Sequence, residues 1–188
     1  MPLNVLLLGP QGAGKGTQAK RISAEYGIPH IASGEILRAE MDAGTELGKR
    51  VKETIERGDL VSDDLMIELI RNRLEQPDTE AGFVLDGFPR TIVQAEALDS
   101  MFADIGRNFS VAFALQIPDE VAFDRLRRRA RADDTDEAIQ RRLDNYHRET
   151  EPLIEFYRTR GNVVPIHANR SENEVFAEIQ RALEQVPA

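Results

Sequence analysis

Short apolar stretches and longer amphipathic stretches alternate along the chain, and they predict strands separated by helices. Apolar runs predict buried strands at residues 3–8, 28–31, 83–86, 110–117 and 163–166. Apolar residues three and four positions apart predict helices at residues 15–26, 35–42, 47–57, 64–75, 91–105, 119–130, 136–159 and 171–185. This order is typical of an α/β protein, and we expect a doubly wound parallel five-stranded sheet with helices on both faces.

Two stretches interrupt this alternation. Residues 33–61 contain two predicted helices and are too long for a simple connection, so we expect a small helical insertion there. The polar residues 131–136 separate two other helices and predict a second, shorter interruption. We therefore expect one core formed by residues 1–32, 62–129 and 139–188, from which segments 33–61 and 130–138 emerge.

Composition narrows the class of protein. Of the 188 residues, 41% are hydrophobic, which suffices for one well-packed core. Asp and Glu outnumber Lys and Arg by 33 to 24, and the net charge of -9 argues against nucleic acid or an anionic membrane as the main partner. The chain has no cysteine, which excludes disulfides and thiolate zinc sites. The apolar start is too short for a signal peptide, so we expect a cytoplasmic protein.

The glycine-rich stretch from Gly9 to Thr17 is the most informative segment, and it directly follows the first predicted strand. Gly9, Gly14 and Lys15 have the GxxxxGK spacing of a phosphate-binding loop (P-loop). In such a loop, backbone N–H groups and the N-terminus of the next helix converge and favour an anion. Lys15 adds a mobile charge for the outer phosphates of a nucleotide. Gly16 stands where Ser or Thr is usual, and the hydroxyl follows at Thr17.

A second candidate segment, residues 86–90, follows the strand predicted at residues 83–86. Ligands of doubly wound sheets bind beyond the carboxyl ends of the strands, so we expect Asp86 to lie beside the P-loop. A single carboxylate is enough for Mg²⁺, which keeps several waters and also binds substrate phosphates. Arg90 supplies a planar fork that suits phosphate oxygens.

Arginines are concentrated around the second interruption. Arg125 and Arg129 lie four positions apart on one face of a predicted helix, and Arg131 and Arg142 follow. Several guanidinium groups together can neutralise the charge on a phosphoryl group during transfer. The aspartates at 133–134 are placed to pin individual arginines. The remaining arginines of the run are interpreted as surface residues: Arg127, Arg128 and Arg141.

These motifs together resemble the adenylate kinases of the short-lid type, which are nucleoside monophosphate (NMP) kinases. The resemblance covers essentially the whole chain. It is carried by GKGTQ at residues 14–18, SGEILR at 33–38, GDLV at 58–61 and DGFPRT at 86–91, followed by Gln94.

The resemblance implies a P-loop core, an NMP-binding insertion at residues 33–61 and a short lid loop at residues 130–138. The residues that it implies for ATP are Gly12, Ala13, Gly14, Lys15, Gly16, Thr17, Arg125, Arg129, Ala168 and Arg170. Those that it implies for AMP are Ser33, Arg38, Asp59, Leu60, Val61, Gly87, Phe88, Pro89, Arg90, Gln94, Arg131 and Arg142. The residues with catalytic roles are Lys15, Arg90, Arg129, Arg131 and Arg142, and the residue that orients Mg²⁺ through water is Asp86.

The reaction implied by the resemblance is MgATP + AMP ⇌ 2 ADP. The expected cofactor is Mg²⁺ without zinc, the ligands are ATP, AMP and ADP, and we expect a monomer that binds neither nucleic acid nor membranes. This transfer depends on positioning and charge neutralisation, so we nominate no general base. We interpret His30, His147 and His167 as packing or surface residues.

Three alternatives remain open. A UMP/CMP kinase would keep the P-loop and the arginines but change the base-reading positions, where Thr91 and Gln94 favour adenine. A kinase of another small metabolite would leave the segments 33–38 and 58–61 without a role. A nucleotide-binding regulatory module would not need so many cations. ADP formation that depends on the acceptor separates these classes.

Overall fold

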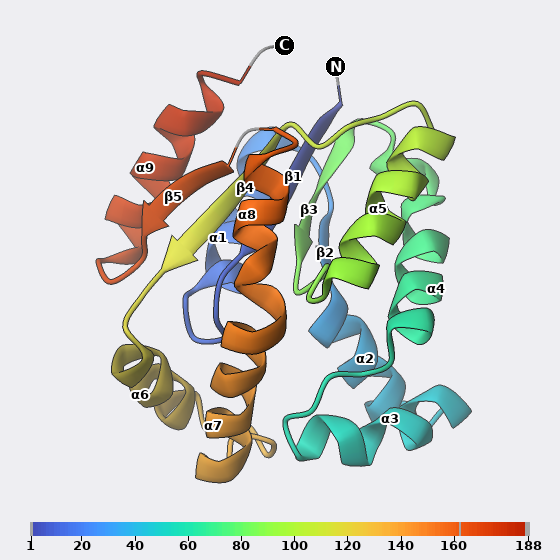
Figure 1. Ribbon diagram of the computed structural model, residues 1–188, viewed down its shortest axis with the longest axis vertical. Coiled ribbons are helices and arrows are strands. Elements are labelled where there is room, and N and C mark those ends of the chain that lie inside the picture. Colours follow the sequence, from blue (N-terminus) through green and yellow to red (C-terminus); the bar gives the residue numbers. More distant parts are fainter. Residues whose placement is uncertain (1, 162, 187–188) are drawn as a thin grey trace.

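The computed structural model describes residues 2–161 and 163–186, and its centre is one five-stranded sheet (Figure 1). The strands are all parallel and stand in the order β2-β3-β1-β4-β5. Their bounds are β1 Leu3–Leu8, β2 His30–Ala32, β3 Gly82–Asp86, β4 Val111–Gln116 and β5 Val163–His167. The predicted α/β fold is therefore confirmed. Because β1 lies between β3 and β4, the segment after β1 begins at the middle of the row formed by the carboxyl ends of the strands.

Helices connect the strands in the described part of the chain. Their bounds are α1 Lys15–Tyr26, α2 Ser33–Asp42, α3 Glu46–Glu56, α4 Asp63–Leu74, α5 Ile92–Asp104, α6 Asp119–Arg129, α7 Asp136–Asn145, α8 Pro152–Arg158 and α9 Glu172–Leu183. Two short segments complete them, the 3₁₀ turn η1 (Pro77–Thr79) and the π-helical segment η2 (Tyr146–Thr150). Apart from the helix predicted at residues 136–159, the predicted bounds of the regular elements agree with these within about two residues.

Two sequence predictions need correction. The strand predicted at residues 28–31 begins only at His30, because the N–H of Ile28 closes α1 by donating to the carbonyl of Ser23 beyond the left-handed Gly27. The helix predicted at residues 136–159 is divided into α7, η2 and α8. Pro152 has no N–H, and its ring conflicts with the carbonyl four residues earlier, so a regular α-helix cannot run through it.

Each face of the sheet carries its own apolar layer. Side chains alternate across a strand, so Leu6 and Leu8 of β1 pack with residues of α4, α5 and α8, whereas Val5 and Leu7 pack with residues of α1 and α9 (Figure 1). This arrangement explains why β1 is apolar at nearly every position. The two layers fix the carboxyl ends of the strands, from which the loops of the site emerge.

A helical hairpin, α2 and α3, stands between β2 and α4 beside the carboxyl ends of the strands (Figure 1). The two helices touch backbone to backbone at Gly48, where any side chain would collide with the carbonyl of Glu40. Thr45 begins α3 by accepting a hydrogen bond from the N–H of Gly48. This hairpin occupies the stretch in which a helical insertion was expected.

The pair α6 and α7 lies across from α2 and α3 (Figure 1), and residues 130–135 connect the two helices of the pair. Ala130 closes α6 with a φ of 52°, a left-handed conformation that is uncommon for alanine. Thr135 begins α7 by accepting from the N–H of Ala138. The irregular connection is therefore shorter than the 130–138 lid of the sequence expectation. In the part of the chain described, no helix is both long and apolar enough to cross a bilayer.

Candidate active site

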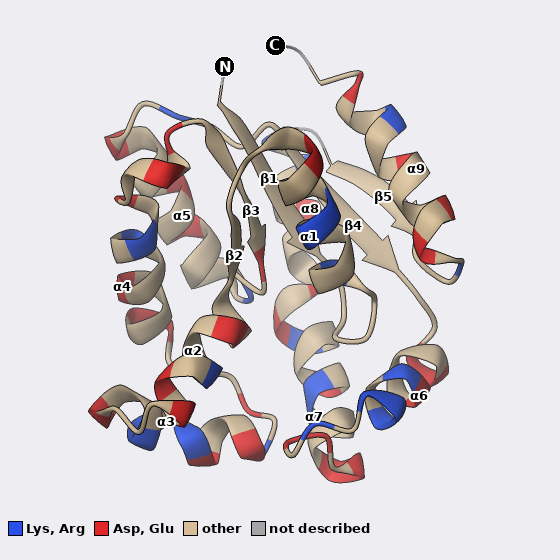
Figure 2. Cartoon of the chain, turned by 180° about the vertical axis from the view of Figure 1, so that it is seen from behind, with Lys and Arg blue, Asp and Glu red and all other residues tan. Residues whose placement is uncertain are grey.

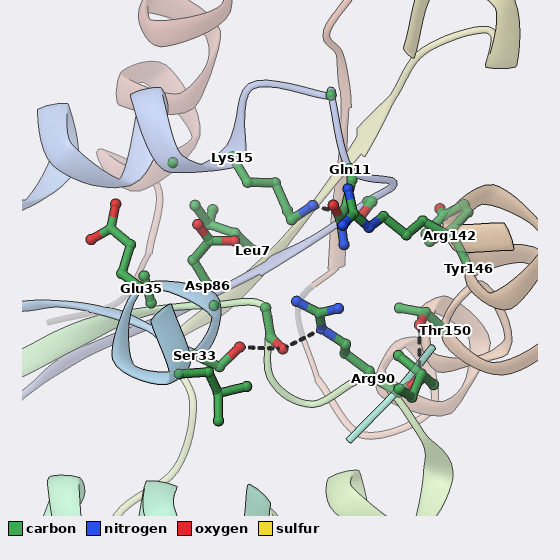
Figure 3. Close-up of a pocket in the computed structure, with 18 of the residues that line it drawn as sticks. Leu7, Gln11, Lys15, Ser33, Glu35, Asp86, Arg90, Arg142, Tyr146 and Thr150 are labelled. Carbon is green, nitrogen blue, oxygen red and sulfur yellow. Dashed lines mark hydrogen bonds between the residues drawn. The ribbon is translucent and has the colours of Figure 1, made fainter. Parts of the chain in front are cut away.

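A cleft of about 440 Å³ lies at the carboxyl edge of the sheet. It is lined by the P-loop, the start of α2, residues 58–61, residues 86, 87, 89 and 90, and parts of α6, α7 and η2. Figure 3 shows the side chains of Lys15, Asp86 and Arg90 around this cavity, each from a different segment. Residues far apart in the sequence therefore meet at the edge where a parallel sheet binds its ligands.

The P-loop has a backbone that depends on glycine. Gly9, Gly12 and Gly14 have φ values of 142°, 85° and 88°, where a side chain is strained. A Cβ at Gly12 would also lie 2.7 Å from the carbonyl oxygen of Ala122 in α6. Gly14 precedes α1 and has no side chain to cap it, so the first N–H groups of this helix can bind an anion in the cleft.

Lys15 folds back on its own loop. Its Nζ donates hydrogen bonds to the carbonyl oxygens of Gly9 and Pro10, at 2.7 and 2.8 Å. Burial lowers the pKa of Lys15 to about 8, although the neighbouring carboxylate of Asp86 opposes this shift and Arg90 adds to it. An anion entering the cleft would stabilise the ammonium, so the group is poised to transfer from the loop carbonyls to a phosphate.

Asp86 ends β3 and presents an ionised carboxylate to the cleft. Burial raises the pKa of Asp86, but His30, Lys15 and Arg90 together outweigh it and hold the pKa below its ordinary value. The Nε2 atom of His30 lies 3.6 Å from Asp86 Oδ2. His30 packs in the sheet, as expected, but its position beside the carboxylate was missed. The contact arises because β2 pairs with β3 in parallel, with His30 opposite Val84 and Ala32 opposite Asp86.

Arginines from separate elements converge on the cleft. Arg38 comes from α2, Arg90 follows β3, Arg142 comes from α7, and Arg129 and Arg131 lie where α6 joins its connection. Burial lowers the pKa of Arg38 and of Arg90, and the neighbouring arginines add to the shift. Clustered cations repel one another unless an anion lies between them. The cleft therefore favours a ligand with several negative charges.

Two aspartates hold part of this cluster in place. Asp134, whose side chain is 0% exposed, accepts hydrogen bonds from Arg129 at 2.7 and 2.9 Å and from Arg142 at 2.8 Å. Asp133 pairs with Arg142 Nη2 at 2.5 Å. Figure 2 shows the basic segments of α6 and α7 and the acidic stretch between them. The expectation that residues 133–134 pin individual arginines is confirmed for Arg129 and Arg142.

Comparison with known proteins decides the family. The model of the adenylate kinase family matches residues 7–162 of the sequence. The chain belongs to the adenylate kinase family. It is 43% identical to the adenylate kinase of Phocaeicola vulgatus over 188 positions, which cover 98% of this chain and 100% of that protein. It is 42% identical to that of Stenotrophomonas maltophilia strain K279a over 185 positions, covering 96% and 99%.

A third adenylate kinase, from Methanosarcina barkeri, is 40% identical over 213 positions, which cover 97% of this chain and 99% of that protein. This alignment is longer than the 188 residues of the chain, so the archaeal protein contains residues that the present chain lacks. The resemblance drawn from the motifs is confirmed, and the chain is a nucleoside monophosphate kinase, a phosphotransferase.

Most residues expected at the site of this adenylate kinase line the cleft. They are Gly12, Gly14, Lys15, Gly16, Thr17, Ser33, Arg38, Asp59, Leu60, Val61, Asp86, Gly87, Pro89, Arg90, Gln94, Arg125, Arg129, Arg131 and Arg142. Arg125 reaches the loop itself, because its guanidinium donates to the carbonyl oxygens of Gly12 and Ala168 at 3.3 and 3.1 Å.

Four expected site residues do not line the cleft. Ala13, Phe88 and Ala168 are buried in apolar surroundings, where their small or apolar side chains contribute to the core. Arg170 instead pairs with Glu178 and donates to the carbonyl of His167, which keeps its guanidinium on α9. Ala168 still acts on the site indirectly, through the carbonyl that Arg125 contacts.

Other lining residues were missed from the sequence. Tyr146 and Thr150 of η2 line the cleft, as does Asn145 at the end of α7. Asn145 Nδ2 donates to the carbonyl oxygen of Gly58 at 3.2 Å and so joins α7 to the segment after α3. A signal was present, since Arg142, Tyr146 and Thr150 recur every four positions on the predicted helix.

The cleft also has an apolar part, lined by Leu60, Val61 and Met66. Gln94 of α5 lines the same cleft, and only 2% of its surface is exposed. Its Oε1 accepts from the N–H of Arg90 at 2.8 Å. Apolar walls with one amide suit a nucleobase. Among residues 2–161 and 163–186, no group of three or more His, Cys, Asp or Glu side chains is arranged to enclose a metal ion.

Proposed function

We propose that this chain catalyses MgATP + AMP ⇌ 2 ADP in the cleft described above. The observation that carries the proposal is the convergence of Lys15, Asp86 and six arginines around one cavity that also holds an apolar part with Gln94. An oxygen of the AMP phosphate attacks the γ-phosphorus of ATP, and the bond from that phosphorus to the β–γ bridging oxygen breaks. ADP is both the leaving group and the new product.

The P-loop binds the donor phosphates. Backbone N–H groups of residues 12–17 face the β- and γ-phosphates, and Lys15 leaves the carbonyls of Gly9 and Pro10 to neutralise them. Arg125 stays on the loop and supports its shape, while Arg129 reaches the donor phosphates from the end of α6.

The acceptor phosphate lies against Ser33, Arg38 and Arg90. The Ser33 hydroxyl and Arg90 Nε both donate to the carbonyl oxygen of Gly87, each at 2.7 Å, as Figure 3 shows. This shared carbonyl fixes the two groups relative to each other, which is the positioning that in-line transfer requires. The base of AMP lies along residues 58–61 and Gln94.

The transferred group is neutralised by Arg131 and Arg142 from the α6–α7 arm together with Arg90. Such neutralisation replaces acid or base catalysis, because phosphoryl transfer of this kind develops charge on the oxygens rather than requiring a nucleophile from the protein. The insertion at residues 33–61 and the lid at 130–138 close over both nucleotides and exclude water, which is the competing acceptor.

Mg²⁺ enters with ATP. The lining residues suit it, because Asp86 is an ionised carboxylate in the cleft and Mg²⁺ prefers oxygen ligands. Asp86 would hold the ion through its water shell, and the bound ion supplies further charge neutralisation of the β- and γ-phosphates. Zinc has no part in the proposal, since the chain has no cysteine.

We further propose that the chain is a cytoplasmic monomer that contacts neither nucleic acid nor membranes. The net charge of -9 and the lack of cysteine agree with this. Light scattering of the purified chain at several concentrations tests the monomer.

The experiment is to incubate the purified chain with MgATP and with AMP, UMP, CMP or no acceptor, and to follow diphosphate formation. Rapid ADP formation with AMP alone is the expected result. A preference for UMP or CMP would overturn the base assignment and keep the kinase. Nucleotide binding without transfer would overturn the catalytic roles given to the arginines.

A further inference from the structure

Asp63 opens α4 and lies outside all of the motifs, yet its carboxylate contacts the residue that faces the base. Asp63 Oδ1 accepts a hydrogen bond from Gln94 Nε2 at 2.9 Å and another from the hydroxyl of Thr91, also at 2.9 Å. On the other side of the same amide, Gln94 Oε1 accepts from the main-chain N–H of Arg90 at 2.8 Å. The Gln94 amide is therefore held at both of its ends.

These two contacts fix which way the amide points. The oxygen and nitrogen ends of a carboxamide have almost the same shape, so only the hydrogen-bond partners choose between the two orientations. In the reverse orientation the NH₂ group would face the Arg90 N–H, and the oxygen would face the Asp63 carboxylate. Both pairs would be repulsive, and little water can compensate because Gln94 is 2% exposed.

The amide keeps unused capacity for a ligand. An amide oxygen can accept two hydrogen bonds and an NH₂ group can donate two, and each has spent one on the protein. A purine with a 6-amino group offers a donor at position 6 and an acceptor at N1, which matches this orientation. A 6-oxopurine offers an acceptor at position 6 and a donor at N1, which matches the reverse orientation.

We propose that Asp63 is a positioning residue that sets the preference for AMP over 6-oxopurine monophosphates by fixing the orientation of the Gln94 amide. The inference rests on the proposed function, because it takes AMP as the acceptor. Asp63 contributes the stronger of the two constraints, since a charged acceptor binds an N–H more strongly than a neutral group does. A site that leaves a buried polar group mismatched discriminates far better than one that relies on shape alone.

The test compares kcat/KM for AMP and for inosine monophosphate in the wild-type chain, Asp63→Asn and Asp64→Asn. Asn can present either its oxygen or its NH₂ to Gln94, so it no longer enforces one orientation. We expect the AMP-to-IMP ratio of kcat/KM to fall by about tenfold or more in Asp63→Asn, with the value for IMP rising. Asp64→Asn is the matched control, since it makes the same change at the next residue in the first turn of α4, where the side chain is exposed. Its ratio should equal that of the wild type.

The ratio separates positioning from a general structural effect, because a loosened site lowers kcat/KM for both acceptors together. An unchanged ratio in Asp63→Asn would overturn the inference, as would an equal fall in Asp64→Asn. If Asp63→Asn does not fold, as judged by circular dichroism, Asp63→Ser removes the carboxylate at a helix start that tolerates serine and carries the same expectation. A wild-type chain that makes no ADP from AMP would overturn the proposed function itself, and this is measured first.

Discussion

The hydroxyl of Thr150 donates a hydrogen bond of 2.8 Å to the main-chain carbonyl oxygen of Arg90 (Figure 3). The N–H of Arg90 is held at the same time by Gln94. Side chains thus bind both polar groups of the main chain at Arg90, whose guanidinium lines the cleft. The π-helical segment η2 brings Thr150 to this position, and π-helical turns are frequent at functional sites.

Replacing Thr150 by valine should lower kcat by about tenfold. The change leaves the Arg90 carbonyl without its partner at a site where Thr150 is only 9% exposed, which costs about 1–3 kcal/mol and frees the arginine to shift. Steady-state kinetics with AMP measure the effect. Thr150→Ser keeps the hydroxyl and should retain most of the activity, so equal losses in the two variants would contradict the role of the hydrogen bond.

Lys15→Met should reduce kcat/KM for MgATP by about a hundredfold or more while the fold remains intact. In the proposed mechanism the Lys15 ammonium moves onto the phosphates, and removal of one such preorganised charge has effects of this size. Kinetics and thermal melting test both parts. Lys52→Met on α3 is a control with an exposed lysine, and it should behave like the wild type. Near-normal turnover in Lys15→Met would refute the assigned role.

ATP binding should be coupled to proton uptake above pH 8. The pKa of Lys15 is about 8 in the unliganded chain, so the side chain is mostly neutral at pH 9, and the phosphates raise its pKa by stabilising the charged form. Calorimetric titrations at pH 9 in buffers of different ionisation enthalpy should show uptake approaching one proton. At pH 6.5 the uptake due to Lys15 should vanish. Persistence of the uptake in Lys15→Met would assign it to another group.

Gly58→Ala should destabilise the fold by about 1–2 kcal/mol and raise KM for AMP. Gly58 has a φ of 80°, and a Cβ there would lie 2.5 Å from the carbonyl oxygen of Ala138, so the residues that follow α3 would be pushed away from α7. Gly44→Ala is the matched control. Its φ is 65°, but among the described residues no atom lies within 4 Å of the added Cβ. Denaturation should therefore show strain in both variants, whereas only Gly58→Ala should change KM.

His147→Gln should lower stability in mildly acidic solution and leave it unchanged in alkaline solution. Hydrogen bonds to Glu151 and then Asp119 raise the pKa of His147, although partial burial opposes them. A pKa raised by folding stabilises the native state below the unfolded pKa of about 6.5, and this contribution is lost as the pH rises through the folded pKa. Since the side chain is 45% exposed, the effect should be only about 0.2–1 kcal/mol. Urea denaturation at pH 6 and pH 9 measures it, and equal losses at both would contradict the ion pairs.

The sequence predicted those parts of the protein that depend on local pattern. β1 is apolar because both of its faces are buried, and the glycines after it are required by backbone conformation, so the strand and the P-loop could be predicted together. Arg125 and Arg129 of α6 could be recognised because they lie four positions apart on one helix face. Each of these signals lies within about fifteen residues of sequence.

The contacts that join distant segments could not be predicted in this way. Asp63 meets Gln94 only because α4 packs beside α5, and Thr150 meets Arg90 only because Pro152 forces a wider turn before α8. Phe88, in contrast, was expected at the site because it lies within a binding motif, but its apolar side chain packs in the core. Motif membership indicates where the backbone passes, and packing decides where each side chain points.

The buried carboxylate of Asp134 gives nucleotide binding the character of an ion exchange. While it holds Arg129 and Arg142, both cations are already oriented, Arg142 is also largely desolvated, and their mutual repulsion is offset inside the protein. A nucleotide that recruits them must displace a carboxylate of single charge. Monovalent anions gain little by such an exchange, whereas a triphosphate gains several charge pairs. The site therefore selects its ligand by charge before it recognises the base or the sugar.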